Sequence, residues 1–268
     1  MSDHEDSRPP IDLAVVGDGN GRWRVEVVEE TASTNADVAE RCRSGESEGL
    51  VLVAEHQTAG RGRLGREWVT PGRTSLTVSF LLVPGDTPAD RWPWLPLLTG
   101  VAAAAAVHRV AGVEVELKWP NDVLVEGHKL GGILLERVER ETGAAPESAG
   151  AVVGIGINCH QSQEELPIPE ATSLAIVTGG PVDRSALLAA LIEELAVQYD
   201  AWRGGADLRE AYLALCRTPG QDVRVAVPGG GEVVGQAVDV DPAGRLVVRT
   251  EAGEEHLGAG DVVYVRPQ

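Results

Sequence analysis

The sequence has few of the features that mark secreted, zinc-binding or membrane proteins. Its three cysteines are widely spaced and include no CxxC pair, which argues against a disulfide framework and a zinc site. Residues 1–10 are polar and acidic, unlike a secretory signal peptide. The most apolar run, 101–107, is alanine-rich and too short to cross a bilayer. We therefore expect a soluble, cytoplasmic protein.

Positive charge is scarce as well. The chain has 23 lysines and arginines against 41 aspartates and glutamates, and its formal net charge is −18. Such a chain repels a phosphate backbone, which argues against broad electrostatic binding to DNA or RNA. The histidines show no HExxH spacing, and the sequence indicates no particular metal ligands.

The order of apolar and turn-forming residues predicts one large domain, 12–217, and one small domain, 218–268. Residues 1 to about 11 are charged and proline-containing, and we expect them to be disordered. Strands are predicted at 23–29, 50–54, 74–83, 113–119, 122–125, 130–138 and 151–158, and helices at 36–43, 93–110, 183–202 and 207–216. After Thr218 the chain consists of short valine-rich strands separated by glycine-rich turns, which predicts a small β-barrel.

The segment Gly60–Trp68 places three arginines and one tryptophan in a glycine-rich loop. Arginine grips phosphate and carboxylate through paired donors, and an indole can stack on a nucleotide base. The spacing also satisfies GxGxxG, but residues 70–72, Thr-Pro-Gly, cannot open the helix that a dinucleotide site requires. We therefore interpret the loop as a seat for small anions, with a solvated basic loop as the alternative.

Three further segments carry candidate binding residues, each with a plainer structural explanation. Lys118–Asp122 closes an apolar strand, where the lysine suits a phosphoryl or carboxylate oxygen and the other residues suit a turn. Lys129–Leu134 contains paired glycines that fit either a close ligand or a β-bulge. Gly154–Asn158 alternates small residues within a buried strand, and its asparagine fits a turn as well as a ligand. Cys159 has no evident base, which indicates an inert thiol.

Together these segments resemble the biotin protein ligase family. The resemblance covers about residues 28–160 and rests on motifs in the family's order: Ser33-Thr34-Asn35, Gln57 before the arginine loop, Lys118-Trp119-Pro120-Asn121-Asp122, Lys129-Leu130-x-Gly132-Ile133-Leu134 and Gly154-x-Gly156-x-Asn158. It implies an α+β fold: a mixed, mostly antiparallel sheet with packed helices, like that of class II aminoacyl-tRNA synthetases, followed by an SH3-like β-barrel.

The same resemblance implies an enzyme that joins biotin to ATP as biotinyl-5′-AMP and then passes biotin to a lysine of a biotin carboxyl carrier domain. ATP and biotin are then substrates and Mg²⁺ the accompanying ion. Lys118, Arg61 and Arg63 are implied as catalytic. The implied biotin contacts are Ser33, Thr34, Asn35, Gln57, Arg61, Gly62, Arg63, Lys118, Gly131 and Gly132. The implied nucleotide contacts are Arg66, Trp68, Asn121, Lys129 and Asn158.

Three other functions remain as alternatives. A lipoate or octanoate ligase shares the fold and the class of chemistry, although the arginine loop and the Lys118 segment favour biotin. A biotin-sensing repressor needs a DNA-binding domain, and the residues before position 28 are too few and too acidic for one. A regulatory module that has lost catalysis conflicts with the retained Arg61, Arg63 and Lys118.

Overall fold

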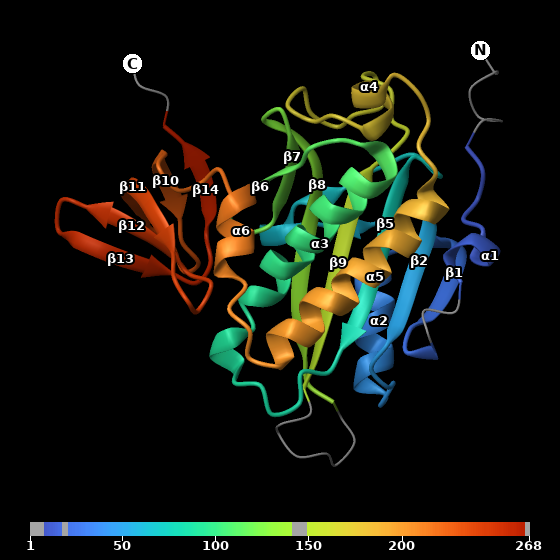
Figure 1. Cartoon of the computed structure of the whole chain (residues 1–268), viewed down its shortest axis with the longest axis horizontal. Coiled ribbons are helices and arrows are strands. Elements are labelled where there is room, and N and C mark those ends of the chain that lie inside the picture. The colour runs from blue at the N-terminus through green and yellow to red at the C-terminus, as the bar shows by residue number, and fades with distance from the viewer. Residues whose placement is uncertain (1–7, 18–20, 141–148, 266–268) are drawn as a thin grey trace.

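A seven-stranded mixed sheet forms the centre of the computed structural model, which describes residues 8–17, 21–140 and 149–265 (Figure 1). The strand order is β1-β2-β5-β9-β8-β7-β6; β1 and β2 run parallel, and every other neighbouring pair is antiparallel. These strands are β1 (Arg24–Thr31), β2 (Leu50–Gln57), β5 (Ser75–Leu82), β6 (Glu116–Lys118), β7 (Asp122–Val125), β8 (His128–Val138) and β9 (Gly150–Asn158). The predicted mixed, mostly antiparallel sheet is confirmed.

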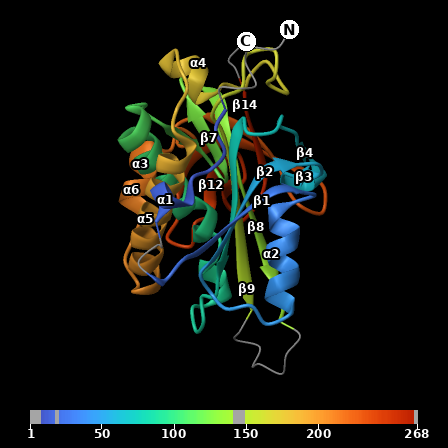
Figure 2. The same cartoon turned by 90° about the vertical axis from the view of Figure 1, so that its right-hand side faces the viewer.

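Helices cover both faces of this sheet (Figure 2). They are α1 (Leu13–Val16), α2 (Thr34–Arg43), α3 (Trp94–Ala111), α4 (Leu174–Thr178), α5 (Arg184–Arg203) and α6 (Arg209–Leu215), with short 3-10 turns η3 (Arg63–Gly65) and η4 (Ala89–Arg91). Helix α2 packs on one face against β2, β5, β8 and β9, and α3 and α5 pack together on the other. The cap residues Ser33 and Asp183 begin α2 and α5 by accepting hydrogen bonds from the first turn.

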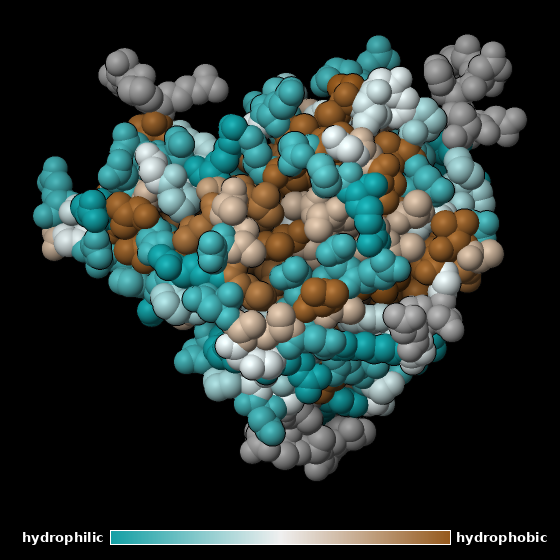
Figure 3. Space-filling model, in the orientation of Figure 1, coloured by the Kyte–Doolittle hydropathy of each residue, from teal (hydrophilic) through white to brown (hydrophobic). Residues whose placement is uncertain are grey.

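Helix α3 is mostly buried between α5 and the sheet. The segment Ala89–Ala111 is long and apolar enough to cross a membrane by length and composition, but most of it is buried within the protein. Its alanines allow close packing against α5 and β8. The outer face over α3 and α5 mixes hydrophilic and hydrophobic side chains (Figure 3).

The N-terminal segment differs from the expectation of disorder. Residues 1–7 lie outside the described part of the chain, but Ile11 is buried, and its amide donates to Glu55 Oε1 at 2.5 Å. The Arg184 guanidinium donates to the Pro9 carbonyl and to Glu55, so a buried ion pair fastens this segment to β2 and α5. Helices α1 and α4, which we did not predict, are each no longer than five residues, too short to show a helical repeat.

The C-terminal region is a five-stranded antiparallel sheet in the order β13-β12-β11-β10-β14, consistent with the expected SH3-like domain. Its strands are β10 (Asp222–Ala226), β11 (Glu232–Val240), β12 (Leu246–Thr250), β13 (Gly253–Leu257) and β14 (Asp261–Tyr264). It packs beside β6 and α6 (Figure 1). Trp119 enters this contact fully buried, and its indole Nε1 donates to the Gly244 carbonyl at 3.0 Å.

Candidate functional site

The site has a floor of glycines where β5, β9 and β8 run side by side. Register places Ser79, Gly154 and Leu134 in one row, and Thr77, Gly156 and Gly132 in the next. A Cβ on Gly154 would lie 2.1 Å from Asn35 Oδ1, and one on Gly156 would lie 2.5 Å from the Trp68 ring. The glycines therefore leave space for one side chain from α2 and one from the arginine loop, which explains the small-residue alternation of β9.

A cavity of about 240 Å³ opens above this floor. Most of the predicted site residues line it: Ser33, Thr34, Asn35, Gln57, Arg61, Gly62, Arg63, Arg66, Trp68, Asn121, Lys129, Gly132 and Asn158. Lys118 and Gly131 are not among its lining residues. The fold thus brings segments separated by more than a hundred residues around one small space.

The end of the cavity at α2 is a hydrogen-bonded cluster of neutral side chains. Gln57 Oε1 accepts from the Thr34 amide at 2.8 Å and lies 3.0 Å from the Thr34 hydroxyl. Ser79 Oγ lies 2.7 Å from Thr34 Oγ1 and 2.6 Å from Asn35 Oδ1. All four side chains are buried, so the cluster suits a neutral ligand with both donors and acceptors.

The arginine loop folds back on itself over the cavity. Gly60 pairs with Trp68 and Arg61 with Glu67 in a two-stranded ribbon of β3 (Gly60–Arg61) and β4 (Glu67–Trp68). A Cβ on Gly60 would lie 2.4 Å from the Trp68 carbonyl, so only glycine permits this pairing. No helix opens after Gly65, as residues 70–72 indicate, and the dinucleotide interpretation is excluded.

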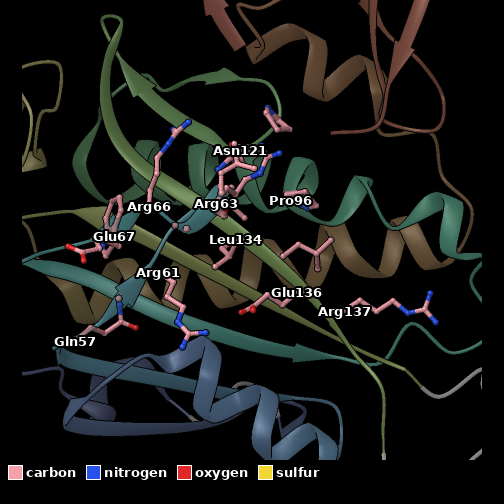
Figure 4. A pocket seen from close by; sticks show the side chains of 18 of the residues that line it. Gln57, Arg61, Arg63, Arg66, Glu67, Pro96, Asn121, Leu134, Glu136 and Arg137 are labelled. Carbon is pink, nitrogen blue, oxygen red and sulfur yellow. Dashed lines mark hydrogen bonds between the residues drawn. The ribbon is translucent and has the colours of Figure 1, made fainter. Parts of the chain in front are cut away.

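The cationic side chains of the loop point into different parts of the site (Figure 4). Arg61 extends toward the end near α2 and Gln57, whereas Arg63 donates to Asn121 Oδ1 at 3.1 Å. Burial lowers the pKa of Arg63, although a guanidinium stays charged at neutral pH. Arg66 pairs with Asp261 of β14. Trp68 Nε1 is buried and has no hydrogen-bond partner within the described ranges.

The two lysines of the site have different surroundings. Lys129 lines the cavity, where its Nζ lies 2.5 Å from Asp122 Oδ1. A register shift between β7 and β8 skips Leu130, so the bulge allowed for in the sequence is present, and Lys129 lies 3.5 Å from a Cβ built on Gly132. Lys118 instead lies over the Tyr264 ring, 5.1 Å from its centroid, and burial lowers its pKa.

The structure gives Asn158, Gly131 and Cys159 structural roles or surroundings. Asn158 donates to the Thr172 carbonyl at 3.0 Å and accepts from Gln161, which holds the chain beyond β9 against the cavity. A Cβ on Gly131 would lie 2.5 Å from the Gly156 carbonyl, so this glycine permits close strand pairing. Cys159 is fully buried, and burial raises the pKa of its thiol to about 12, in agreement with an inert cysteine.

Comparison with known proteins decides the family. Residues 27–158 match the biotin/lipoate A/B protein ligase family, and residues 218–264 match the biotin protein ligase C-terminal domain. The biotin–[acetyl-CoA-carboxylase] ligase of Mycobacterium tuberculosis is 40% identical over 99% of this chain and 100% of its own. This chain belongs to the biotin protein ligase family.

Other members of the biotin protein ligase family extend the comparison. The biotin protein ligase of Aquifex aeolicus, solved in complex with biotin and ATP, has a TM-score of 0.75 at 28% identity, covering 91% of this chain and 99% of that one. The bifunctional ligase/repressor BirA of Bacillus subtilis is 29% identical over 86% of this chain and 71% of its own.

Within this biotin protein ligase fold, sequence reasoning missed three polar residues at the site. Ser79 and Glu136 contact Asn35, and Asp261 reaches the cavity from the C-terminal sheet. A weak signal was present for Ser79, because Ser75, Thr77 and Ser79 alternate with Leu76, Val78 and Phe80 along β5. Glu136 and Asp261 resemble ordinary strand residues in sequence, and only the fold reveals their place.

Proposed function

We propose that this protein is an ATP-dependent biotin protein ligase. It activates biotin as biotinyl-5′-AMP, releases pyrophosphate, and transfers biotin to a lysine of a biotin carboxyl carrier domain. One observation carries this conclusion: a single cavity beneath one arginine loop gathers a cluster of neutral hydrogen-bonding side chains at α2 together with Arg61, Arg63 and Lys129. Biotin combines a neutral ureido ring with a carboxylate, and ATP supplies the second anion.

The first step joins two anions. A carboxylate oxygen of biotin bonds to the α-phosphorus of ATP, while the bond between that phosphorus and the pyrophosphate oxygen breaks. Positive groups offset the repulsion of the reactants and the charge that develops on the phosphate. We assign this role to Arg61, Arg63 and Lys129, all of which line the cavity. Lys118 is half-buried over the Tyr264 ring, outside the lining of the cavity, and contributes its positive charge from there.

The neutral end positions the ureido ring. Ser33, Thr34, Asn35 and Gln57 offer hydroxyl and amide groups there, and Gly132 leaves room above the floor. Gly131 supports this site through strand pairing, and Gly62 through the loop backbone. At the opposite end, Arg66, Asn121 and Asn158 line the space for the nucleotide, and Trp68 offers its ring to the adenine.

Mg²⁺ accompanies ATP in this proposal, and the residues present fit it. In the described ranges no three His, Cys, Asp or Glu side chains lie close enough together to hold a metal ion, but Mg²⁺ needs only one or two carboxylates beside substrate phosphates. Asp122 and Asp261 line the cavity and supply such oxygens. When bound, the ion would neutralise part of the phosphate charge.

The second step uses the acceptor lysine. Its amine attacks the carbonyl carbon of the mixed anhydride, an amide bond forms, and AMP leaves. The intermediate must be kept from water until then, and the loop over the cavity provides cover. We propose a cytoplasmic location, supported by three cysteines that are all buried and free. We also propose 12–217 as the catalytic domain and 218–268 as the C-terminal domain.

The proposal predicts biotin-dependent exchange of labelled pyrophosphate into ATP by the purified chain with Mg²⁺. Lipoate and octanoate should give no exchange, because they lack the ureido donors that the neutral end accepts. Transfer of labelled biotin to a carrier domain, and its loss when the acceptor lysine is replaced by arginine, tests the second step. Folded protein that exchanges with lipoate and not with biotin would overturn the assignment.

A further inference from the structure

The Asn35 amide is held at both ends by residues from two different strands. Its Nδ2 donates to Glu136 Oε2 at 2.8 Å and to the Leu134 carbonyl at 3.4 Å, and its Oδ1 lies 2.6 Å from the Ser79 hydroxyl. A carboxylate and a carbonyl only accept hydrogen bonds. The nitrogen must therefore face β8 and the oxygen must face β5, so the hydrogen-bond network determines the orientation of the amide.

The sheet is built to admit this arrangement. Ser79, Gly154 and Leu134 lie next to one another across β5, β9 and β8, and the Asn35 side chain lies over this row. Any Cβ on Gly154 would collide with the Asn35 amide, at 2.1 Å from Oδ1. Ser79 is fully buried and Asn35 nearly so, which makes an unpartnered amide at this point costly.

The proton count defines what Asn35 offers a ligand. Both Nδ2 hydrogens are directed to β8. The Ser79 hydroxyl has one hydrogen and lies near both Thr34 Oγ1 and Asn35 Oδ1; when the Thr34 hydroxyl donates to Ser79, one Oδ1 lone pair of Asn35 receives the Ser79 hydrogen. One acceptor lone pair of Oδ1 remains, and Asn35 lines the cavity. In this orientation the side chain accepts a hydrogen bond from a ligand and donates none. The ureido ring of biotin carries two N–H donors.

We propose that Ser79 and Glu136 are positioning residues of the biotin site, which hold the Asn35 amide with its oxygen available to a ureido N–H. This inference rests on the proposed function, since it takes biotin as the ligand. Neither residue contacts the reacting atoms. Glu136 acts through Asn35, and Ser79 acts from the opposite side through Asn35 and its neighbour Thr34. Their loss weakens recognition of the ureido donor without affecting the nucleotide.

The test measures biotin binding and exchange kinetics for Ser79→Ala and Glu136→Leu. Each should raise the Kd for biotin about tenfold, as expected when one oriented hydrogen bond is lost. The KM for ATP, and kcat at saturating biotin, should change less than about twofold. Glu136→Gln keeps an accepting oxygen at the same place and should restore most of the biotin affinity.

A second measurement separates positioning from general damage. Biotin methylated on its ureido nitrogens lacks the donor, so the wild type should bind it far more weakly than biotin. In Ser79→Ala the ratio of the Kd for methylated biotin to the Kd for biotin should fall by about the factor by which the Kd for biotin rises. A merely structural change would weaken both ligands equally and leave the preference intact.

Ser75→Ala is the matched control. Ser75 is a buried serine on the same face of β5, and its hydroxyl accepts from Gln161 Nε2 at 2.6 Å instead of contacting Asn35. Its substitution should leave the biotin Kd unchanged. The inference is overturned if Ser79→Ala and Glu136→Leu bind biotin normally, or if Ser75→Ala weakens binding equally. Absence of biotin binding by the wild type would instead contradict the proposed function.

Discussion

Identical side chains in this protein differ in what they can do because their neighbours differ. Lys118 and Lys129 both belong to motifs shared with the family. Lys129 nevertheless faces the cavity beside Asp122, whereas Lys118 lies over the Tyr264 ring. An ammonium on a flexible stem acts on a phosphate only where it can reach it. The β-bulge after Lys129, rather than the residue type, gives this lysine its access.

At this scale we expect Lys129→Ala to reduce adenylate formation on the order of 10²-fold, the loss typical of an oriented electrostatic donor. Lys118→Ala should reduce it less, because its ammonium does not line the cavity. Single-turnover formation of biotinyl-AMP measures both, with circular dichroism to check folding. An equal or larger loss in Lys118→Ala would show that Lys118 contacts the reactants when they bind.

At the scale of elements, helix α2 places neutral side chains of the site at its N-terminus and is held to the sheet at its C-terminus. Ser33, Thr34 and Asn35 lie at its N-terminus, whereas Arg41 in its last turn donates to Glu26 of β1 at 2.6 and 2.9 Å. Arg41 also bonds Glu46 beyond the helix. The helix is thus fixed to the sheet at both ends, and its first turn cannot rotate freely away from Ser79.

The anchor makes stability depend on pH. The Arg41 guanidinium lowers the pKa of Glu26 from its ordinary 4.5 to about 2. The ion pair between Arg41 and Glu26 therefore contributes fully to the free energy of unfolding above pH 4.5, and this contribution is lost as pH falls from 4.5 toward about 2. Solvent reaches about a third of each side chain, so we expect a loss of only about 1 kcal/mol in the free energy of unfolding.

Urea unfolding of the wild type and Glu26→Gln across this pH range measures the effect. The difference in the free energy of unfolding between the two proteins should shrink as pH falls, since the amide that replaces the carboxylate does not titrate. Glu40→Gln, at a pair that is far more exposed, serves as the control and should show little change. A constant difference between wild type and Glu26→Gln would contradict this account.

At the scale of the whole molecule, the two sheets share one hydrophobic core. Buried residues of the C-terminal strands, such as Val223 and Val248, belong to the same core as Trp119 and α3. Trp119 donates from its backbone to Thr218 and from its indole to Gly244, and Trp94 donates to the Pro242 carbonyl. Arg66 reaches Asp261, so the C-terminal sheet also borders the ligand cavity.

This shared core predicts a single cooperative unfolding transition for the wild type. Trp119→Ala should remove about 3–5 kcal/mol and let the C-terminal sheet unfold separately, because the side chain that fills the interface is gone. Trp202→Ala removes an equally buried indole that stacks on Tyr199 within α5, and should lower one transition without dividing it. Calorimetry distinguishes one transition from two; a single transition in Trp119→Ala would refute independent unfolding.

The sequence alone determined the chemistry of this protein. The combination of glycine, arginine and tryptophan in Gly60–Trp68 indicates a loop that binds small anions. Small residues spaced by two along Gly154–Asn158 indicate one face of a strand. The positions of most strands and helices could also be predicted from the sequence, since apolar periodicity is a local property. The ends of the elements and the short helices α1 and α4 could not be predicted, because tertiary contacts decide them.

Only the tertiary structure decided which polar groups meet. Asn35 reaches Ser79, 44 residues away, and Glu136, 101 residues away, because the register of three strands puts those residues in adjacent positions. A shift of one residue would turn Ser79 to the other face of the sheet. The bulge between β7 and β8 is likewise a feature of strand pairing, and it brings Lys129 to the cavity. Local sequence specifies side chains, and long-range pairing specifies their partners.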